Sequence, residues 1–123
     1  MTHANSPADQ PVLTVTAQDI NCDTYVLRLT GDLDLHQIGP LDEALAVALR
    51  MQPPLRLLVI DLAGVGFCDS SGLNVFLDAR QATEDLGIEL RLVRPTLPVQ
   101  RLLQITGTVK IFRLYDDLPQ ALA

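Results

Sequence analysis

The apolar run over residues 57–60 is the feature that most constrains the fold, because no polar residue interrupts it. A strand with one face in water alternates polar and apolar side chains, whereas a strand covered on both faces is apolar throughout. Asp61 follows the run, and Gly64 and Gly66 come shortly after, which predicts that the chain turns there and then enters a helix. The sequence therefore predicts that residues 57–62 form the central strand of a sheet.

Apolar spacing predicts the other elements. Alternation and strand-forming residues predict strands, whereas apolar residues three and four positions apart predict helices. The predicted strands, of which the first two form a hairpin, lie at residues 12–16, 25–30, 57–62, 88–92 and 111–114. The predicted helices lie at residues 38–49, 75–86, 96–105 and 116–122. This order predicts an α/β fold in which about four helices pack mainly on one side of a mixed sheet of about five strands.

Length and composition predict one domain. A chain of 123 residues that is 48% hydrophobic suits a single core, since such a chain buries roughly two thirds of the surface that it exposes when unfolded. Residues 1–10 are polar and contain no basic segment leading into an apolar stretch, so they are expected to be a flexible tail and not a secretory signal. The domain is expected to span residues 11–123.

Charge limits the kinds of partner that the chain can bind, and cysteine content indicates its compartment. Fifteen acidic and nine basic residues give a net charge of -6, so the phosphates of nucleic acids and of anionic membranes would repel the chain. No apolar run approaches the roughly 20 residues that a membrane-spanning helix needs. Only Cys22 and Cys68 are present, which fits a reducing compartment. We expect a cytoplasmic protein that binds other proteins, and neither nucleic acid nor membrane.

The motif Asp69-Ser70-Ser71-Gly72 follows the predicted central strand and has two interpretations. Asp and Ser are common helix N-caps, because their side-chain oxygens accept hydrogen bonds from the free amides of the first turn. The same position also exposes a hydroxyl that a kinase can modify, at a helix end whose amides favour an anion. Local sequence alone leaves both interpretations open.

A second acidic motif, Gly31-Asp32-Leu33-Asp34, ends the second predicted strand. In the predicted sheet it can share an edge with the serines, which would place two carboxylates near them. The alternative is that Asp32 and Asp34 only cap or lead into the first helix.

Enzymatic and cofactor chemistry lack support in the sequence. A serine hydrolase needs a base, and the two histidines, His3 and His36, lie in the predicted tail and at a helix entry, while the G-x-S-x-G elbow is absent. Gly64 and Gly66 are not followed by the G-K-[ST] of a phosphate loop. The Cys and His spacings do not match a zinc site. We predict no catalytic residue, no metal and no cofactor.

Several motifs together resemble those of bacterial anti-sigma factor antagonists, which belong to the STAS domain family. The resemblance covers about residues 11–123 and is carried by G-D-L-D, by the buried strand ending in Asp-Leu, by F-x-D-S-S-G-L at residues 67–73, and by residues 97–107. Two positions depart from the family pattern, since Asn74 stands where many relatives have Gly and Asp32 replaces a more frequent Glu. These departures bear on partner choice more than on fold.

The resemblance implies a partner-switching role in a stress response. Ser70 matches the serine that is phosphorylated by a partner that is both an anti-sigma factor and a serine kinase, whereas Ser71 matches a normally unmodified serine. The unphosphorylated form would bind the anti-sigma factor and release a sigma factor, and a PP2C-type phosphatase would restore it. A monomer or a weak dimer is compatible with this role. The expected partner-binding residues are Asp32, Asp34, Asp69, Ser70, Ser71, Gly72 and Asn74.

A phosphate would act on binding more than on folding. It adds roughly 1.5 to 2 negative charges, which a helix N-terminus tolerates but which an interface closing beside several carboxylates would have to desolvate. The sequence also leaves open another role, in which a STAS domain serves as a scaffold or small-ligand-binding module in a multiprotein signalling complex without a direct sigma factor circuit.

Overall fold

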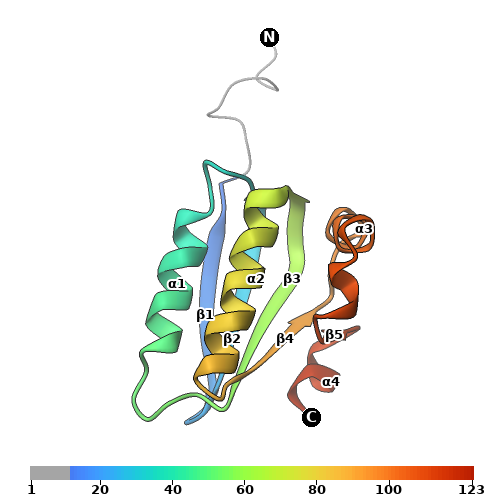
Figure 1. The fold of residues 1–123 in the computed structure, drawn as a ribbon. Helices are drawn as coiled ribbons and strands as arrows, with labels where there is room; N and C mark the ends of the chain where they lie inside the picture. The colour runs from blue at the N-terminus through green and yellow to red at the C-terminus, as the bar shows by residue number, and fades with distance from the viewer. Residues whose placement is uncertain (1–11) are drawn as a thin grey trace.

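The computed structural model describes residues 12–123, so the predicted tail at residues 1–10 lies outside the described part (Figure 1). Five strands form one sheet in the order β1-β2-β3-β4-β5. β1 is antiparallel to β2, and the other neighbouring pairs are parallel. The elements are β1 (Thr14–Asn21), β2 (Thr24–Leu33), α1 (Gly39–Leu49), β3 (Leu57–Cys68), α2 (Ser70–Asp85), β4 (Glu89–Val93), α3 (Leu97–Thr106), a 3-10 helix (Thr108–Lys110), β5 (Leu114–Tyr115) and α4 (Leu118–Leu122).

Helices cover the two faces of the sheet unequally, as Figure 1 shows with α1 and α2 lying in front of the strands. The main core contains the side chains of Leu58, Ile60 and Leu62 on β3 together with buried residues of α1, α2 and α3. Alternate side chains of the same strand, Leu57 and Val59, form a small second cluster with α4 on the other face. Cover on both faces explains why this strand is apolar throughout, and it confirms the predicted mixed α/β fold with β3 at its centre.

The predicted end of the central strand is wrong, because β3 continues through both glycines to Cys68. A Cβ atom on Gly64 would lie 2.7 Å from the carbonyl oxygen of Leu29. The glycine therefore permits a close approach of two strands, where the pairing register of β2 and β3 shifts, which is a common use of glycine inside a strand. Gly66 lies in the same extended stretch and not in a turn.

The predicted last strand is also largely wrong. The strand was predicted at residues 111–114, but residues 111–113 are not in a strand, and β5 contains only Leu114 and Tyr115. At the other end of the chain, β1 extends to Asn21, well beyond the predicted strand at residues 12–16. Pairing along β2 explains the longer strand, since the register runs from Thr14 opposite Thr30 to Asn21 opposite Thr24.

Asp61 lies inside β3 with only 3% of its surface exposed. Its carboxylate lies 3.6 Å from Nε of Arg28 on the neighbouring strand, and it accepts a hydrogen bond from Nε of Arg94 at 3.3 Å. A buried carboxylate needs such partners, because its desolvation is otherwise unfavourable by several kcal/mol. The carboxylate of Asp61 therefore links β3 to Arg28 on β2 and to Arg94 directly after β4. It does not mark a turn.

Candidate protein-binding site at the carboxyl edge of the sheet

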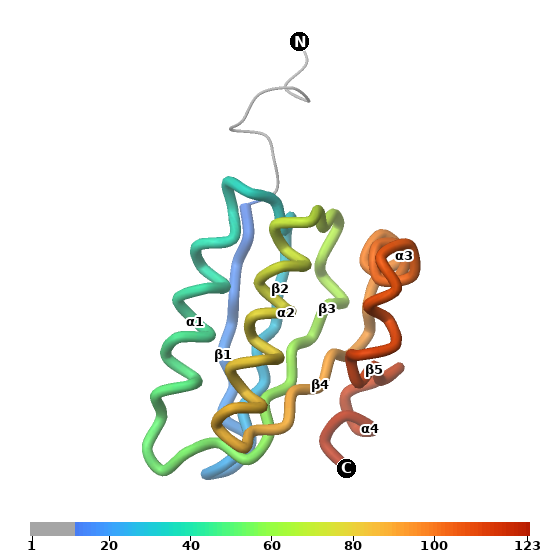
Figure 2. The backbone as a smooth tube through the Cα atoms, in the orientation of Figure 1, coloured from blue at the N-terminus to red at the C-terminus, as the bar shows by residue number. Residues whose placement is uncertain are grey.

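The ends of β2 and β3 form the candidate site. The two strands are parallel, and Asp32 pairs with Phe67 and Leu33 with Cys68, so both strands end at the same edge. The backbone N–H of Asp69 then donates to the carbonyl oxygen of Leu33 at 3.1 Å. Figure 2 shows the chain leaving β2 beside the start of α2. The sheet therefore brings the two acidic motifs to one edge, as the sequence predicted.

Asp69 is the N-cap of α2. Its Oδ1 accepts hydrogen bonds from the backbone N–H groups of Ser71 at 2.8 Å and of Gly72 at 3.3 Å. This satisfies two amides that the helix leaves free, so the capping interpretation is confirmed for Asp69. Ser70 is the first residue of the helix and is not the cap.

The two serines differ in exposure. Ser70 is exposed, whereas Ser71 is half-buried. Asn74 is also exposed and lies four residues after Ser70, which puts both on the same face of α2. Ser70 is therefore open to solvent at the start of α2, while the hydrogen bonds of Asp69 hold the backbone of the first turn.

Gly72 is buried under this surface. A Cβ atom there would lie 2.8 Å from Sγ of Cys68 and 2.9 Å from Cβ of Leu33. The glycine thus lets the first turn of α2 pack against the ends of β2 and β3. Burial, with a smaller contribution from the charge of Asp69, raises the pKa of the Cys68 thiol to about 12, so this thiol is a packing group and not a nucleophile.

Asp34 organises the loop between β2 and α1. Its Oδ1 accepts from the backbone N–H of His36 at 2.9 Å, and its Oδ2 accepts from Nε2 of Gln37 at 3.3 Å. Gln37 in turn accepts from the backbone N–H of Leu13 at 3.0 Å. These contacts support the alternative in which Asp34 leads into the first helix, although the N-cap of α1 itself is Ile38.

Asp32 points its carboxylate toward the uncovered backbone of β3. It is half-buried, and its Oδ1 lies 3.4 Å from the place where Gly66 would carry a Cβ atom. The edge that carries Ser70 thus also carries three carboxyl groups, those of Asp32, Asp34 and Asp69. Added negative charge on this edge would meet repulsion from all three.

Two apolar side chains at the edge, Leu35 and Phe67, were missed by the sequence analysis. Leu35 is 65% exposed and Phe67 is 48% exposed. Single exposed apolar residues are common on protein surfaces, so these two add to the description of the edge and do not by themselves mark a binding surface. Phe67 was missed because the glycines were interpreted as a turn. Simple alternation would not have indicated its exposure either, because Phe67 lies two residues after the buried Val65 and a regular strand places both on one face.

Two further features concern residues 12–123 as a whole. Within that range, no group of three or more His, Cys, Asp and Glu side chains is arranged to hold a metal ion. No helix of the described residues is long and apolar enough to cross a bilayer. The edge itself carries an exposed serine with acidic and apolar neighbours.

Comparison with known proteins places this geometry in a family. The STAS domain model matches residues 13–121. An anti-sigma F factor antagonist of Paenibacillus polymyxa is 32% identical over 97 residues, which cover 79% of this chain and 82% of that protein.

Solved structures share the fold. An anti-sigma factor antagonist from Mycobacterium paratuberculosis superposes with a TM-score of 0.72 at 26% identity, covering 89% of this chain and 91% of that one. The STAS domain of a SulP transporter from Vibrio cholerae has a TM-score of 0.71 at 20% identity, covering 85% and 81% of the two chains; at this identity the likeness concerns the fold alone. From the family match over nearly the whole described chain, the protein belongs to the STAS domain family.

Proposed function

We propose that this chain is an anti-sigma factor antagonist and that phosphorylation of Ser70 switches its binding off. The observation that carries the proposal is the exposed Ser70 at the first position of α2, on an edge with three carboxylates and two exposed apolar groups. Similarity to the Paenibacillus polymyxa antagonist supports it. The partner would be an anti-sigma factor that is also a serine kinase, and the proposed circuit operates in the cytoplasm.

The proposed binding surface surrounds Ser70. Asp32 and Asn74 would contact the partner directly, and Leu35 and Phe67 would supply the apolar area that gives an interface most of its affinity. The remaining predicted residues act mainly through shape. Asp34 and Asp69 fix the two loops, Ser71 provides a capped amide, and Gly72 permits the close packing below them.

Phosphorylation would leave the fold intact. In this step Oγ of Ser70 bonds to the γ-phosphorus of ATP, ADP leaves, and the hydroxyl proton passes to a base of the kinase. The phosphate then lies at a helix N-terminus, where the helix dipole favours negative charge by about 0.3 to 1 kcal/mol. A PP2C-type phosphatase would hydrolyse the ester and restore the hydroxyl.

Binding, in contrast, would weaken strongly. A partner that closes over phosphorylated Ser70 has to strip water from roughly two negative charges beside Asp32, Asp34 and Asp69. A net penalty of about 2.7 kcal/mol corresponds to about a hundredfold loss of affinity. Desolvation of an incompletely paired dianion reaches that magnitude readily.

Kinase treatment tests the modified position. Intact mass spectrometry after incubation with the cognate anti-sigma factor and ATP should show one added phosphate, and fragmentation should place it on Ser70. Ser70→Ala should remain unmodified, whereas Ser71→Ala, the matched control one residue away, should still gain phosphate. Phosphate on another residue would refute the assignment.

Variants of the same serine test the switch. Ser70→Asp should weaken binding of the cognate anti-sigma factor, and Ser70→Ala should retain it. Failure of the unmodified protein to bind any anti-sigma factor kinase from its source would favour the alternative role of scaffold or small-ligand-binding module.

A further inference from the structure

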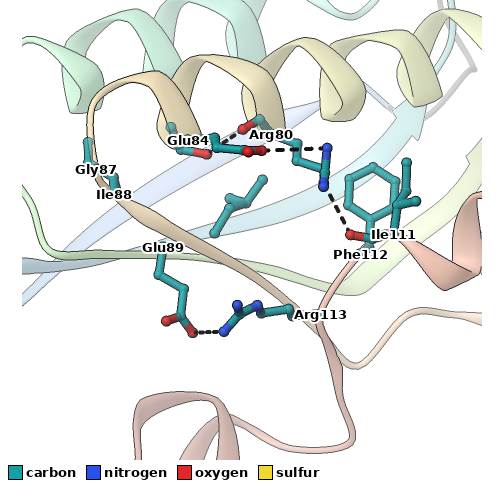
Figure 3. A pocket seen from close by; sticks show the side chains of 10 residues that line it. Arg80, Glu84, Gly87, Ile88, Glu89, Ile111, Phe112 and Arg113 are labelled. Atoms are coloured by element: carbon teal, nitrogen blue, oxygen red, sulfur yellow. Dashed lines mark hydrogen bonds and ion pairs between the residues drawn. The ribbon is translucent and has the colours of Figure 1, made fainter.

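A cleft of about 430 Å³ lies at the end of α2 that is far from Ser70, and its charges balance. Figure 3 shows Arg80 with Glu84 on the helix, and Glu89 with Arg113 across from them. Two arginines thus face two glutamates. The cleft carries no surplus charge that would select a ligand, in contrast to the outer surface of α3.

The outer face of α3 carries two exposed apolar side chains with an arginine between them. Leu97, Arg101 and Ile105 follow one another at intervals of four residues, so they form one stripe of about 12 Å, which we call the α3 stripe. Leu97 is 55% exposed and Ile105 is 83% exposed, while Val99 and Leu103 hold the opposite side of the helix in the core. A surface helix normally turns polar side chains outward, so both outward apolar groups depart from the usual pattern.

The α3 stripe belongs to a segment that has no acidic residue. Residues 90–115 contain five of the nine basic residues of the chain and none of its fifteen acidic ones. Three of the five pair with carboxylates outside the segment. The other two, Arg101 and Lys110, form no ion pair with another residue of the described chain. The guanidinium of Arg101 can therefore bind a carboxylate of a partner, although the chain as a whole has a net charge of -6.

The α3 stripe begins next to the Ser70 edge. Oγ1 of Thr96 donates to the carbonyl oxygen of Val65 at 2.6 Å, which fixes the start of α3 beside β3, as Figure 1 shows. Val65 lies only two residues, or about 7 Å, before the exposed Phe67. A partner that covers Ser70 and Phe67 is therefore close to Leu97 as well.

We propose that the anti-sigma factor also contacts α3, through an acidic and apolar segment that packs on the α3 stripe. The inference rests on the proposed function and adds a second contact area to it. Apolar groups of the partner would cover Leu97 and Ile105 and remove them from water. Arg101 would then be buried between them, and a buried guanidinium needs a carboxylate, because desolvation of an unpaired charge opposes binding. The segment must therefore supply at least one Asp or Glu.

Opposite charges on the two contact areas would orient the partner. The Ser70 edge carries the carboxylates of Asp32, Asp34 and Asp69, whereas the α3 stripe carries Arg101. A partner has to place basic groups on the edge and acidic groups on the helix, and the reversed orientation would bring like charges together. A second copy of this chain suits the stripe less well, because two α3 stripes packed about a two-fold axis would bring their Arg101 side chains together.

Isothermal titration of full-chain variants against the cognate anti-sigma factor tests the contact. Ile105→Ser should weaken binding about tenfold. Arg101→Gln should weaken it about threefold and Arg101→Glu about tenfold or more, because only the second variant places a negative charge against the carboxylate of the partner. Equal losses for the two Arg101 variants would overturn the acidic character of the segment.

Two variants at the opposite end of the molecule are matched controls. Leu86→Ser removes a 55% exposed apolar side chain at the end of α2, and Arg50→Glu reverses a charge at the end of α1. Both should bind within about twofold of the original chain. Circular dichroism checks that all variants are folded.

The titrations distinguish failure of this inference from failure of the proposed function. If the original chain does not bind the anti-sigma factor, both fail. If it binds and the α3 variants bind equally well, or the controls lose as much affinity, only the contact at α3 fails. Sedimentation of the chain alone should show no self-association that Ile105→Ser abolishes. A dimer that depends on Ile105 would assign the α3 stripe to a second copy and overturn the proposal.

Discussion

Replacement of Gly72 with alanine should destabilise the protein, although alanine normally favours a helix. The new Cβ atom would lie 2.8 Å from Sγ of Cys68, 2.9 Å from Cβ of Leu33 and 3.1 Å from the carbonyl oxygen of Leu33. Neither neighbour is the end of a long flexible side chain, so the start of α2 has to move away from the sheet. Overpacking of this kind costs about 1 to 3 kcal/mol, whereas Gly to Ala in a helix gains at most about 1 kcal/mol.

The expected net loss in the free energy of unfolding is about 1 to 2 kcal/mol. For a domain of this size that corresponds to a fall in Tm of roughly 3 to 12 °C. Urea unfolding followed by circular dichroism measures the change directly. Gly39→Ala is the matched control, because Gly39 opens α1 and nothing lies within 4 Å of the added Cβ atom.

A double variant tests the proposed clash. If Sγ of Cys68 is the closest obstacle, then Gly72→Ala should be less destabilising in a Cys68→Ala background than in the original protein, giving a measurable coupling energy. An unchanged or increased stability of Gly72→Ala alone would refute the close packing of α2 against the end of β2. The exposed position of Ser70 at the start of α2 depends on that packing.

Three further predictions follow from individual side chains. A thiol reagent at about pH 8 should modify Cys22, which is exposed. It should leave Cys68 unmodified until denaturant is added, because burial raises the pKa of Cys68 to about 12. Modification of both thiols in the folded protein would contradict this prediction. Hydrogen bonding and charge from Arg91 lower the pKa of Glu89 below its ordinary value of 4.5, so its contribution to stability is present above that pH and lost as the pH falls below it. Stability of Glu89→Gln should therefore vary less than that of the original protein as urea unfolding is repeated at falling pH, and equal slopes would exclude the ion pair. Phe67→Ser should weaken binding of the anti-sigma factor by about tenfold or more without lowering Tm, and unchanged affinity would remove Phe67 from the interface.

The order of the elements was predictable because each depends on nearby residues. The apolar run at residues 57–60 indicated a strand covered on both faces, and the structure places it between the main core and the α4 cluster. The later elements follow similar local patterns. In contrast, the end of β3 depends on Leu29 from another strand, so the glycines alone could not distinguish a close strand contact from a turn.

The position of the candidate site was predictable from the sequence, but the role of each residue in it was not. The two acidic motifs indicated where the strands end, and parallel pairing brought them to one edge. The structure was needed to tell which residue caps α2 and which is exposed. Asp69 accepts hydrogen bonds from the helix amides, and Ser70 is left exposed. The burial of Asp61 could not be predicted, because Arg94, which pairs with it, lies 33 residues away along the chain.

The most direct test of the switch is the affinity of authentic phosphoprotein for the cognate anti-sigma factor. Isothermal titration of the unmodified chain and of the form phosphorylated at Ser70 should give Kd values that differ by about a hundredfold or more, with unchanged unfolding midpoints for the two forms. Equal affinities of two folded forms would contradict the claim that a charge at the start of α2 controls binding.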